Sequence, residues 1–233
     1  MPVSAPMRVL AIDTALAACS AAILDTKQGG IIASASLPMV RGHAEALIPL
    51  LARLLDEARM LLRNFDRVVV TTGPGSFTGL RVGISAARGI ALAAGKPAVG
   101  LSTLLAYAAP HLADDETIPV VAAIDARHQH VYLQVFGPGS RTIIAPRLAP
   151  LSEAVRAAAE VPARLVGSAA QAIADGLAAA GAVPVIVDAR GAPDIAWVAR
   201  MGAAVPEGQS PPKPQYLRAP DAQPQNAAHL PRR

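Results

Sequence analysis

The stretch RVLAIDT (residues 8–14) is an apolar run that ends in Asp13, and it has a second copy in VVAAIDA (residues 120–126), which ends in Asp125. A short apolar run bounded by turn residues is typical of a buried β-strand. Each copy is followed by a further strand-like segment, first CSAAILD and later HVYLQVF. The chain therefore predicts two units built on one plan.

The same order of elements extends outward from both copies. The first half predicts strands over residues 7–12, 19–25, 31–37, 67–71 and 97–101 and helices over 44–62, 78–94 and 103–112. The second half predicts strands over residues 119–124, 130–136, 142–146, 164–166 and 183–187 and helices over 152–159, 169–180 and 194–204. A duplicated α/β unit with mixed sheets is the outline of the actin-like, sugar-kinase and Hsp70-type (ribonuclease H-like) fold.

This plan predicts two lobes and a tail. The N-terminal lobe, with the partner-binding helices, is expected over residues 1–101 and the C-terminal lobe over 102–205. The tail, residues 206–233, contains seven prolines, which favours an extended and poorly packed segment. Within it only QYLR (residues 215–218) has side chains suited to docking.

Composition excludes several classes of protein. Of the 233 residues, 52% are hydrophobic and 16% charged, as in a compact protein with a large buried surface. No apolar run reaches the ~18 residues of a membrane helix. The start shows no basic segment followed by an apolar one, so a cytoplasmic protein without membrane contact is expected. A single cysteine, Cys19, agrees with that compartment and predicts a small buried strand residue.

Charge alone predicts little about nucleic acids. The net charge is +4, but the basic residues are scattered along the sequence rather than grouped. Three Phe, three Tyr and one Trp offer few rings on which bases could stack. Independent recognition of RNA is therefore not expected.

The glycine-rich stretch TTGPGSFTGLRVG (residues 71–83) matches no phosphate-binding motif. Gly79 is followed by Leu80 and Arg81, whereas a P-loop needs Lys and then Ser or Thr. Thr78 stands where a dinucleotide fingerprint needs its third glycine, and the nucleophile-elbow pattern fails as well. The stretch instead predicts a rigid strand-to-helix corner, in which the glycines permit positive φ and a hydroxyl caps the next helix. Its structural residues are Gly73, Pro74, Gly75, Ser76 and Thr78.

Four motifs together resemble the TsaB (YeaZ-type) family. They are VLAIDT near the start, TTGPGSFTGLRVG, AAIDAR followed by VY, and QYLR, and they occur in the order of that family. The resemblance implies the dimerisation subunit of the bacterial complex that makes threonylcarbamoyladenosine in tRNA. It further implies a TsaD-like catalytic subunit and a TsaE-like P-loop ATPase as partners. ATP and metal are then expected to bind to the partner subunits, and tRNA is expected to bind this chain only as part of the complex. The chain alone is expected to form a homodimer.

Two helices are expected to carry the partner interface. On the helix over 78–94, residues of small size recur every four positions, which lets another backbone approach closely. The apolar arc of the helix over 44–62 spans roughly 160°, wider than the ~100° stripe of an ordinary surface helix. The expected interface residues are Leu47, Leu51, Leu54, Leu55, Ala58, Gly79, Gly83, Ala87 and Ala91. The alternative is that the small-residue stripe packs only on its own sheet.

Metal-dependent catalysis lacks its expected residues. In the TsaD relatives two histidines one helical turn apart bind metal, and an ungapped match places Thr103 and Tyr107 there. His128 and His130 lie two apart on an expected strand and could face the same way, although a solvent-facing pair is favoured without a third ligand. The family more often has an acidic residue at the position of His130.

Nucleotide binding also lacks its expected residues. The fold normally holds ATP between its lobes with an Asp-x-Gly hairpin, whose glycine lets backbone amides approach phosphate. Here the hairpins read Asp13-Thr14-Ala15 and Asp125-Ala126-Arg127. Asp13, Thr14 and Asp125 remain weak candidates for a lobe-interface cofactor site, while both aspartates alternatively cap turn amides.

The function predicted is that of a noncatalytic scaffold subunit that activates a TsaD-like enzyme, with no strongly bound cofactor, no metal and no catalytic residues of its own. The alternative is a stand-alone enzyme of this fold, either an ATP-dependent kinase or a glycoprotease-like metallopeptidase. The homodimer and the heterodimer use the same helices, so the sequence leaves the choice between them open.

Overall fold

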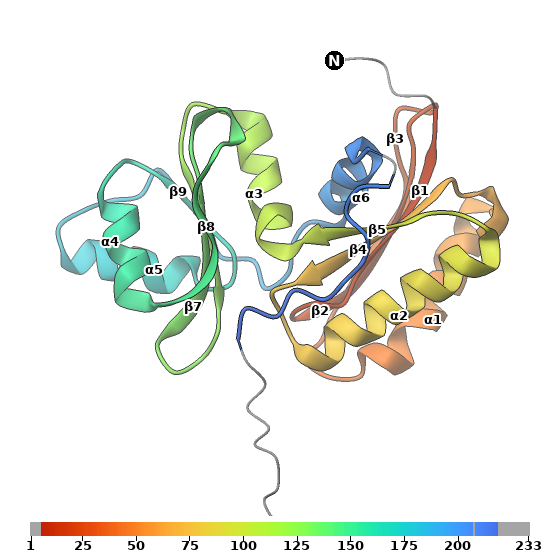
Figure 1. Ribbon diagram of the computed structural model, residues 1–233, viewed down its shortest axis with the longest axis horizontal. Coiled ribbons are helices and arrows are strands. Elements are labelled where there is room, and N and C mark those ends of the chain that lie inside the picture. The colour runs from red at the N-terminus through yellow and green to blue at the C-terminus, as the bar shows by residue number, and fades with distance from the viewer. Residues whose placement is uncertain (1–5, 207, 219–233) are drawn as a thin grey trace, which may run out of the picture.

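The computed structural model describes residues 6–206 and 208–218 and contains two five-stranded mixed sheets (Figure 1). The first sheet and the helices between its strands comprise β1 (Arg8–Asp13), β2 (Ala18–Asp25), β3 (Gly30–Pro38), α1 (His43–Ala58), η1 (Leu62–Asn64), β4 (Arg67–Gly73), α2 (Phe77–Ala94) and β5 (Ala98–Ser102). The second half comprises α3 (Thr103–Asp114), β6 (Val120–Asp125), β7 (His130–Phe136), η2 (Pro138–Ser140), β8 (Thr142–Pro150), α4 (Leu151–Ala159), β9 (Arg164–Val166), α5 (Ala170–Ala179), β10 (Ile186–Asp188) and α6 (Ile195–Ala204).

The two sheets have the same topology. Their strand orders are β3-β2-β1-β4-β5 and β10-β9-β6-β7-β8. In each, three antiparallel strands are continued by two parallel ones, because β1 pairs with β2 antiparallel and with β4 parallel, and β6 does the same with β7 and β9. The duplicated actin-like fold predicted from the repeated apolar run is confirmed.

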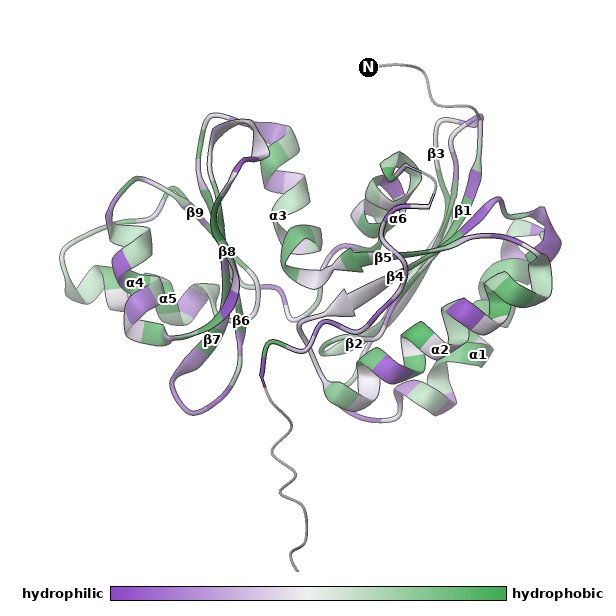
Figure 2. Cartoon of the chain, in the orientation of Figure 1, coloured by the Kyte–Doolittle hydropathy of each residue, from purple (hydrophilic) through white to green (hydrophobic). Residues whose placement is uncertain are grey.

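Each sheet is covered on both faces, which explains the continuous apolar runs of its central strands. In the first lobe α1 and α2 pack on one face and α6 on the other. In the second lobe α4 and α5 cover one face and α3 the other. Apolar and polar residues alternate along α1 and α2 (Figure 2), as expected of helices with one side on a sheet.

The predicted lobe boundary needs correction at its C-terminal end, since α6 belongs to the first lobe. Val198 and Ala199 are fully buried in the core that β1 forms with its neighbours. The guanidinium of Arg67 on β4 also donates to the carbonyls of Gly202 and Val205, at 2.7 and 2.6 Å. The apolar side of α6 closes a sheet face that would otherwise be exposed, so the chain returns to the first lobe after β10.

The first long helix ends earlier than predicted. α1 stops at Ala58, because Arg59 adopts a left-handed conformation with φ of 52° and donates its N–H to carbonyls of the last turn. Leu61 and Leu62 therefore lie outside the helix whose apolar arc they were expected to extend.

The described part of the tail is packed rather than loose. Gly100 N–H donates to the Ser210 carbonyl at 2.8 Å, and the Ser210 hydroxyl donates to the Gly100 carbonyl at 2.9 Å. Gln215 N–H donates to the Thr72 carbonyl at 2.7 Å. The tail thus runs along the β5 edge of the first sheet before it reaches the second lobe. Residues 219–233 of the predicted extended tail lie outside the described residues.

Candidate functional site

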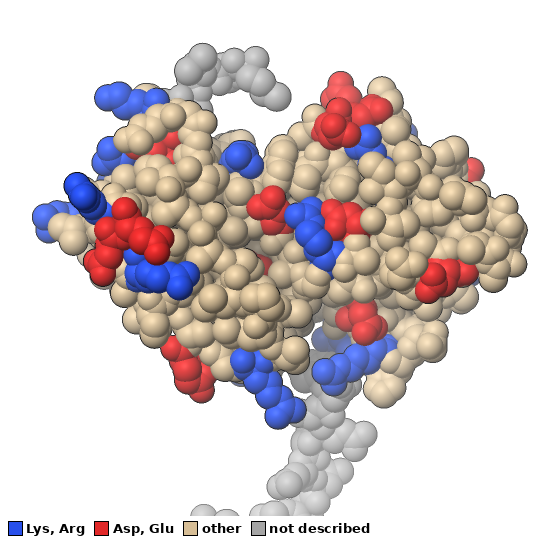
Figure 3. All heavy atoms as spheres, turned by 180° about the vertical axis from the view of Figure 1, so that it is seen from behind, with Lys and Arg blue, Asp and Glu red and all other residues tan. Residues whose placement is uncertain are grey.

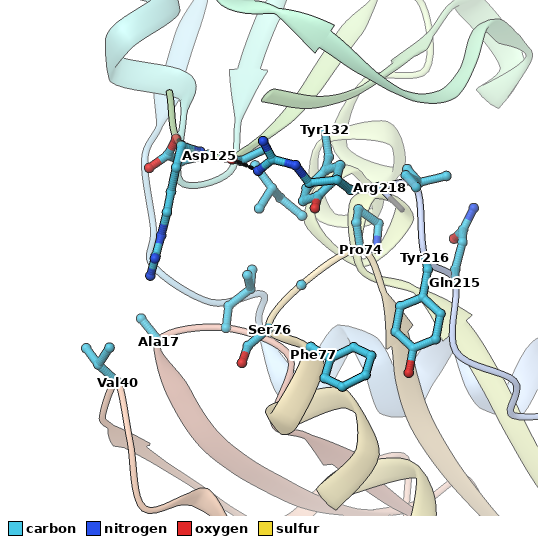
Figure 4. A pocket seen from close by; sticks show the side chains of 16 residues that line it. Ala17, Val40, Pro74, Ser76, Phe77, Asp125, Tyr132, Gln215, Tyr216 and Arg218 are labelled. Atoms are coloured by element: carbon cyan, nitrogen blue, oxygen red, sulfur yellow. Dashed lines mark hydrogen bonds between the residues drawn. The ribbon is translucent and has the colours of Figure 1, made fainter. Parts of the chain in front are cut away.

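A cavity of about 650 Å³ lies between the lobes and is lined mainly by three parts of the chain, with Leu16, Ala17, Val40 and Tyr132 adding to its walls (Figure 4). The loop after β4 contributes residues 74–77, the β6–β7 hairpin contributes residues 124–127, and the tail contributes residues 215–218. A volume between about 300 and 1,000 Å³ is typical of small-molecule sites. This cavity is therefore the place to test the sequence-based site predictions.

The glycine-rich loop is the rigid corner that the sequence predicts. Gly73 has φ of 113°, and the Gly73–Pro74 peptide bond is cis. Ser76 caps α2, because its hydroxyl oxygen accepts the Gly79 N–H at 3.3 Å. Gly75 is required for close approach rather than for positive φ, since an added Cβ would collide with the Ala15 carbonyl oxygen. The loop packs directly on the β1–β2 hairpin.

Thr78 is exposed within the first turn of α2 and does not act as the cap.

Asp13 and Thr14 are sealed inside the first lobe. Asp13 is fully buried, and its Oδ1 accepts hydrogen bonds from the Thr71 hydroxyl and from Ala15 N–H. Burial raises the pKa of the Asp13 carboxyl, against the opposing effect of these hydrogen bonds. The Thr14 hydroxyl donates to the Gly79 carbonyl at 2.7 Å. Neither residue lines the cavity, so the cofactor role is wrong for both and the turn-capping interpretation of Asp13 is confirmed.

Asp125 differs from Asp13, because it is exposed and lines the cavity. Its Oδ1 accepts the Arg127 N–H at 2.8 Å, so it caps its turn as well. The next residues, Arg127, His128 and Gln129, have φ of 63°, 51° and 59°. Such left-handed conformations cost non-glycine residues about 1 to 2 kcal/mol each. The second hairpin is therefore a strained turn beside the cavity.

His128 and His130 do not share a strand from which both could face a metal, and His128 is exposed, in line with the solvent-facing interpretation that was favoured for it. His128 lies in this turn rather than on a strand, and the His130 Nδ1 atom lies 2.8 Å from the His128 carbonyl oxygen. At the positions matched to the metal-binding histidines, Thr103 is fully buried and the Tyr107 hydroxyl donates to the Arg190 carbonyl at 3.0 Å. Among the residues that the structure describes, no group of three or more His, Cys, Asp or Glu side chains could hold a metal ion.

Cys19 is a buried strand residue, as expected. Burial, with a smaller contribution from the neighbouring Asp13 carboxyl, raises the pKa of its thiol to about 11.

The small-residue stripe of α2 faces its own sheet, which corrects the expected interface. A Cβ at Gly79 would collide with the Thr14 carbonyl oxygen, and one at Gly83 would collide with the Thr14 hydroxyl. Ala87 is fully buried and Ala91 is 3% exposed. These positions are small because the β1–β2 hairpin and β4 lie against them.

The corresponding positions of α1 are core residues too. Leu47, Leu51 and Leu54 are buried at 1%, 3% and 0% exposure, while Leu55 and Ala58 are half-buried against the same core. Leu47, Leu51 and Leu54 fill the monomer core and cannot also present their side chains to a partner, whereas Leu55 and Ala58 keep part of their surface exposed and stay possible contact residues.

A different side of the same two helices is open. On α2 the exposed residues include Ser85, Gly89 and Leu92, which lie on the side opposite Gly83 and Ala87. An added Cβ at Gly89 would have no neighbour within 4 Å. On α1, Ile48 is 59% exposed, and Leu92 on α2 is 84% exposed. We call Ile48, Ser85, Gly89 and Leu92 the outer helix face.

Sequence reasoning missed a cluster where the tail meets α2. The Arg81 guanidinium lies 3.7 Å from the centre of the Phe77 ring, and the rings of Phe77 and Tyr216 are 5.3 Å apart. Arg218 continues across the cavity and donates to the Ala126 carbonyl in the second lobe at 3.0 Å. The QYLR motif gave the only signal for this contact.

Charged side chains form no single basic region on the face shown in Figure 3, where Lys and Arg occur in separate groups with Asp and Glu between them. In the described part of the chain, no helix is both long and apolar enough to cross a membrane.

Comparisons with known proteins agree with the sequence resemblance. Residues 18–189 match the family model of TsaD, tRNA N6-adenosine threonylcarbamoyltransferase. An Escherichia coli protein named tRNA threonylcarbamoyladenosine biosynthesis protein TsaB is 40% identical over 126 residues, 54% of this chain and 53% of that protein. The match thus spans about half the length of this relative.

Two further relatives match almost the whole chain. A Mycobacterium bovis protein described as uncharacterized is 34% identical over 221 residues, 93% of this chain and 94% of its own length. The structure of YeaZ from Pseudomonas aeruginosa superimposes with a TM-score of 0.71 at 27% identity, covering 91% of this chain and all of that one.

Proposed function

Because the chain belongs to the TsaB (YeaZ-type) family, within the wider family that the TsaD model describes, we propose that it is a noncatalytic subunit in the synthesis of threonylcarbamoyladenosine in tRNA. It pairs with a TsaD-like catalytic subunit and holds that enzyme in its active arrangement. The threonylcarbamoyl transfer, with its ATP and metal, takes place on the partners. A TsaE-like ATPase joins the complex, tRNA binds only to the assembly, and the chain alone forms a homodimer.

The outer helix face is the observation that carries this proposal. Ser85 and Gly89 are exposed and small, so the backbone of another helix can approach α2 closely there. Ile48 and Leu92 add exposed apolar side chains at 59% and 84%. Such a surface gains free energy when a partner buries it, and it leaves the monomer core intact.

The sealed first hairpin supports a noncatalytic role. Thr14 and Ala15 are both closed over by the loop and first turns of α2, through the hydrogen bonds from Thr14 to Gly79 and from Ser76 to Ala15. A phosphate group has no access to backbone amides that are covered in this way. The stand-alone kinase and metallopeptidase alternatives find no supporting feature among the described residues.

A matched pair of charge substitutions tests the proposed interface. Leu92→Glu places a charge on the outer helix face, and Val183→Glu places the same charge at an equally exposed site in the second lobe, the two side chains being 84% and 85% exposed. We expect Leu92→Glu to weaken binding to a TsaD-like partner at least tenfold, since a charge buried at an interface costs more than 1.4 kcal/mol. Val183→Glu is expected to bind like the unchanged chain.

Affinity is measured by isothermal titration calorimetry, and threonylcarbamoyl transfer to tRNA is measured with the partner subunits present. Circular dichroism melting of both variants controls for folding. Equal affinities for the two variants would reject this helix face as the interface, and transfer by the chain alone would reject the noncatalytic role.

A further inference from the structure

The inter-lobe cavity contains charged groups that the partner role does not use. The Arg127 guanidinium lines it and makes no hydrogen bond or ion pair with any residue that the structure describes. Asp125, labelled in Figure 4, lines the same wall, and only its Oδ1 is engaged, by Arg127 N–H. The cavity thus offers an unpaired cation and an unpaired carboxylate oxygen two residues apart.

The turn that carries these groups is held in an unfavourable conformation. Arg127, His128 and Gln129 all have positive φ, although none is glycine. Strained backbone of this kind persists where the surroundings enforce it, and it often occurs at binding sites. Here Ser168 and Arg127 fix Asp125 from two sides, because the Asp125 N–H donates to the Ser168 hydroxyl at 3.1 Å. The Asp125 carboxylate and the backbone of the turn are therefore held in place before any ligand arrives, and the exposed Arg127 side chain extends from that fixed backbone.

The opposite wall of the cavity is apolar. Phe77 and Tyr216 stand there at 45% and 44% exposure with their rings in contact, as Figure 4 shows. Leu217 and Val40 also line the cavity, and Val40, 81% exposed, lies on the side away from the two rings in Figure 4. An apolar side chain of a ligand would bury part of its surface against this wall and out of contact with water.

The balance of charges favours one class of ligand. Arg127 matches a carboxylate, whose two oxygens accept from the fork of a guanidinium. The free oxygen of Asp125 repels a phosphate dianion more strongly than a singly charged carboxylate, because the dianion carries more negative charge. That oxygen instead matches an N–H donor placed beside the carboxylate. A group with both features on one carbon is the α-amino carboxylate end of an amino acid or peptide.

We propose that the inter-lobe cavity binds the α-carboxylate end of an amino acid or peptide with an apolar side chain. The Arg127 guanidinium donates to the carboxylate, Asp125 accepts from the adjacent N–H, and the Phe77–Tyr216 wall receives the side chain. This site is separate from the outer helix face and does not depend on the partner role.

The test uses three probes with the full chain. They are the tripeptide acetyl-Ala-Ala-Phe with a free carboxylate, the same peptide with a C-terminal amide, and free phenylalanine, each titrated by calorimetry. We expect saturable binding of the acid and at least about tenfold weaker binding of the amide, because a charge-assisted pair is lost. Tighter binding of the tripeptide than of free phenylalanine assigns a peptide terminus, and the reverse assigns a free amino acid.

Two arginine variants test the role of Arg127, one at the cavity and one as its control. Arg127→Gln is expected to weaken binding of the acid probe at least about tenfold. Arg141→Gln removes the same charge from an exposed site in the same lobe that does not line the cavity, and it is expected to leave binding unchanged. The proposal is overturned if acid and amide bind alike, if Arg127→Gln binds normally, or if neither the tripeptide nor free phenylalanine saturates at millimolar concentration.

Discussion

Two glycines on α2, six residues apart, should respond in opposite ways to the same substitution. At Gly83 an added Cβ would collide with the Thr14 hydroxyl and lie 3.3 Å from a methyl group of Val70. At Gly89 an added Cβ would have no neighbour within 4 Å. Gly83→Ala and Gly89→Ala therefore compare the inner and outer sides of one helix.

The magnitudes follow from three terms. Replacing a helical glycine by alanine stabilises the helix by about 1 kcal/mol at either position. At Gly83 the extra methyl overpacks the core, which costs about 1 to 3 kcal/mol. It also displaces the Thr14 hydroxyl from the Gly79 carbonyl, a hydrogen bond of 2.7 Å whose loss costs about 1 kcal/mol. The net expectation is a loss of about 1 to 3 kcal/mol for Gly83→Ala and a gain of about 1 kcal/mol for Gly89→Ala.

The free energy of unfolding is measured by urea denaturation with circular dichroism, at a protein concentration low enough to keep the chain monomeric. The denaturant slope should be the same for both variants, so that the midpoints report stability directly. If Gly83→Ala were as stable as the unchanged chain, the inner stripe would not pack on Thr14, and the correction to the predicted interface would fail.

Three further outcomes are expected. Because the pKa of Asp13 is raised, the protonated carboxyl favours the folded state, and this contribution to stability is present at low pH and is lost as pH rises from 3.8 through the raised pKa. Asp13→Asn should therefore gain stability relative to the unchanged chain as the pH rises above 3.8, and a difference in urea unfolding that does not change with pH would contradict this. Cys19 is buried and the pKa of its thiol is about 11, so it should resist alkylation by iodoacetamide in the folded chain and react when the chain is unfolded in urea. Mass spectrometry measures the labelling, and fast labelling of the folded chain would argue against the burial of Cys19. Truncation after Gln209 should lower the melting temperature, because it removes the contacts of the tail with Gly100 and Thr72. Truncation after Arg218 keeps every described tail contact and serves as the control. Equal melting temperatures of the two truncated chains would show that the tail adds no stability.

Most elements of the fold could be predicted from the sequence because their signals are local. The apolar runs that end in Asp13 and Asp125 predict central strands, and the capping role of both aspartates depends on amides only two residues away. The corner after β4 was predictable for the same reason, since Gly73 and Ser76 act on their own backbone and on the next turn. The spacing of apolar residues and the choice of turn residues both depend on residues that are close together in the sequence.

The tertiary structure alone decided which side of α2 is buried. Small residues occur on both sides of this helix, with Gly83 and Ala87 on one and Ser85 and Gly89 on the other, so residue size does not distinguish them. The choice is made by Thr14, whose hydroxyl bonds to Gly79 across 65 positions of sequence. The return of α6 to the first lobe and the packing of the tail on Gly100 are contacts of the same long-range kind. A periodic pattern specifies that a helix has a buried face, but the partner that buries it is set by where distant segments meet in space.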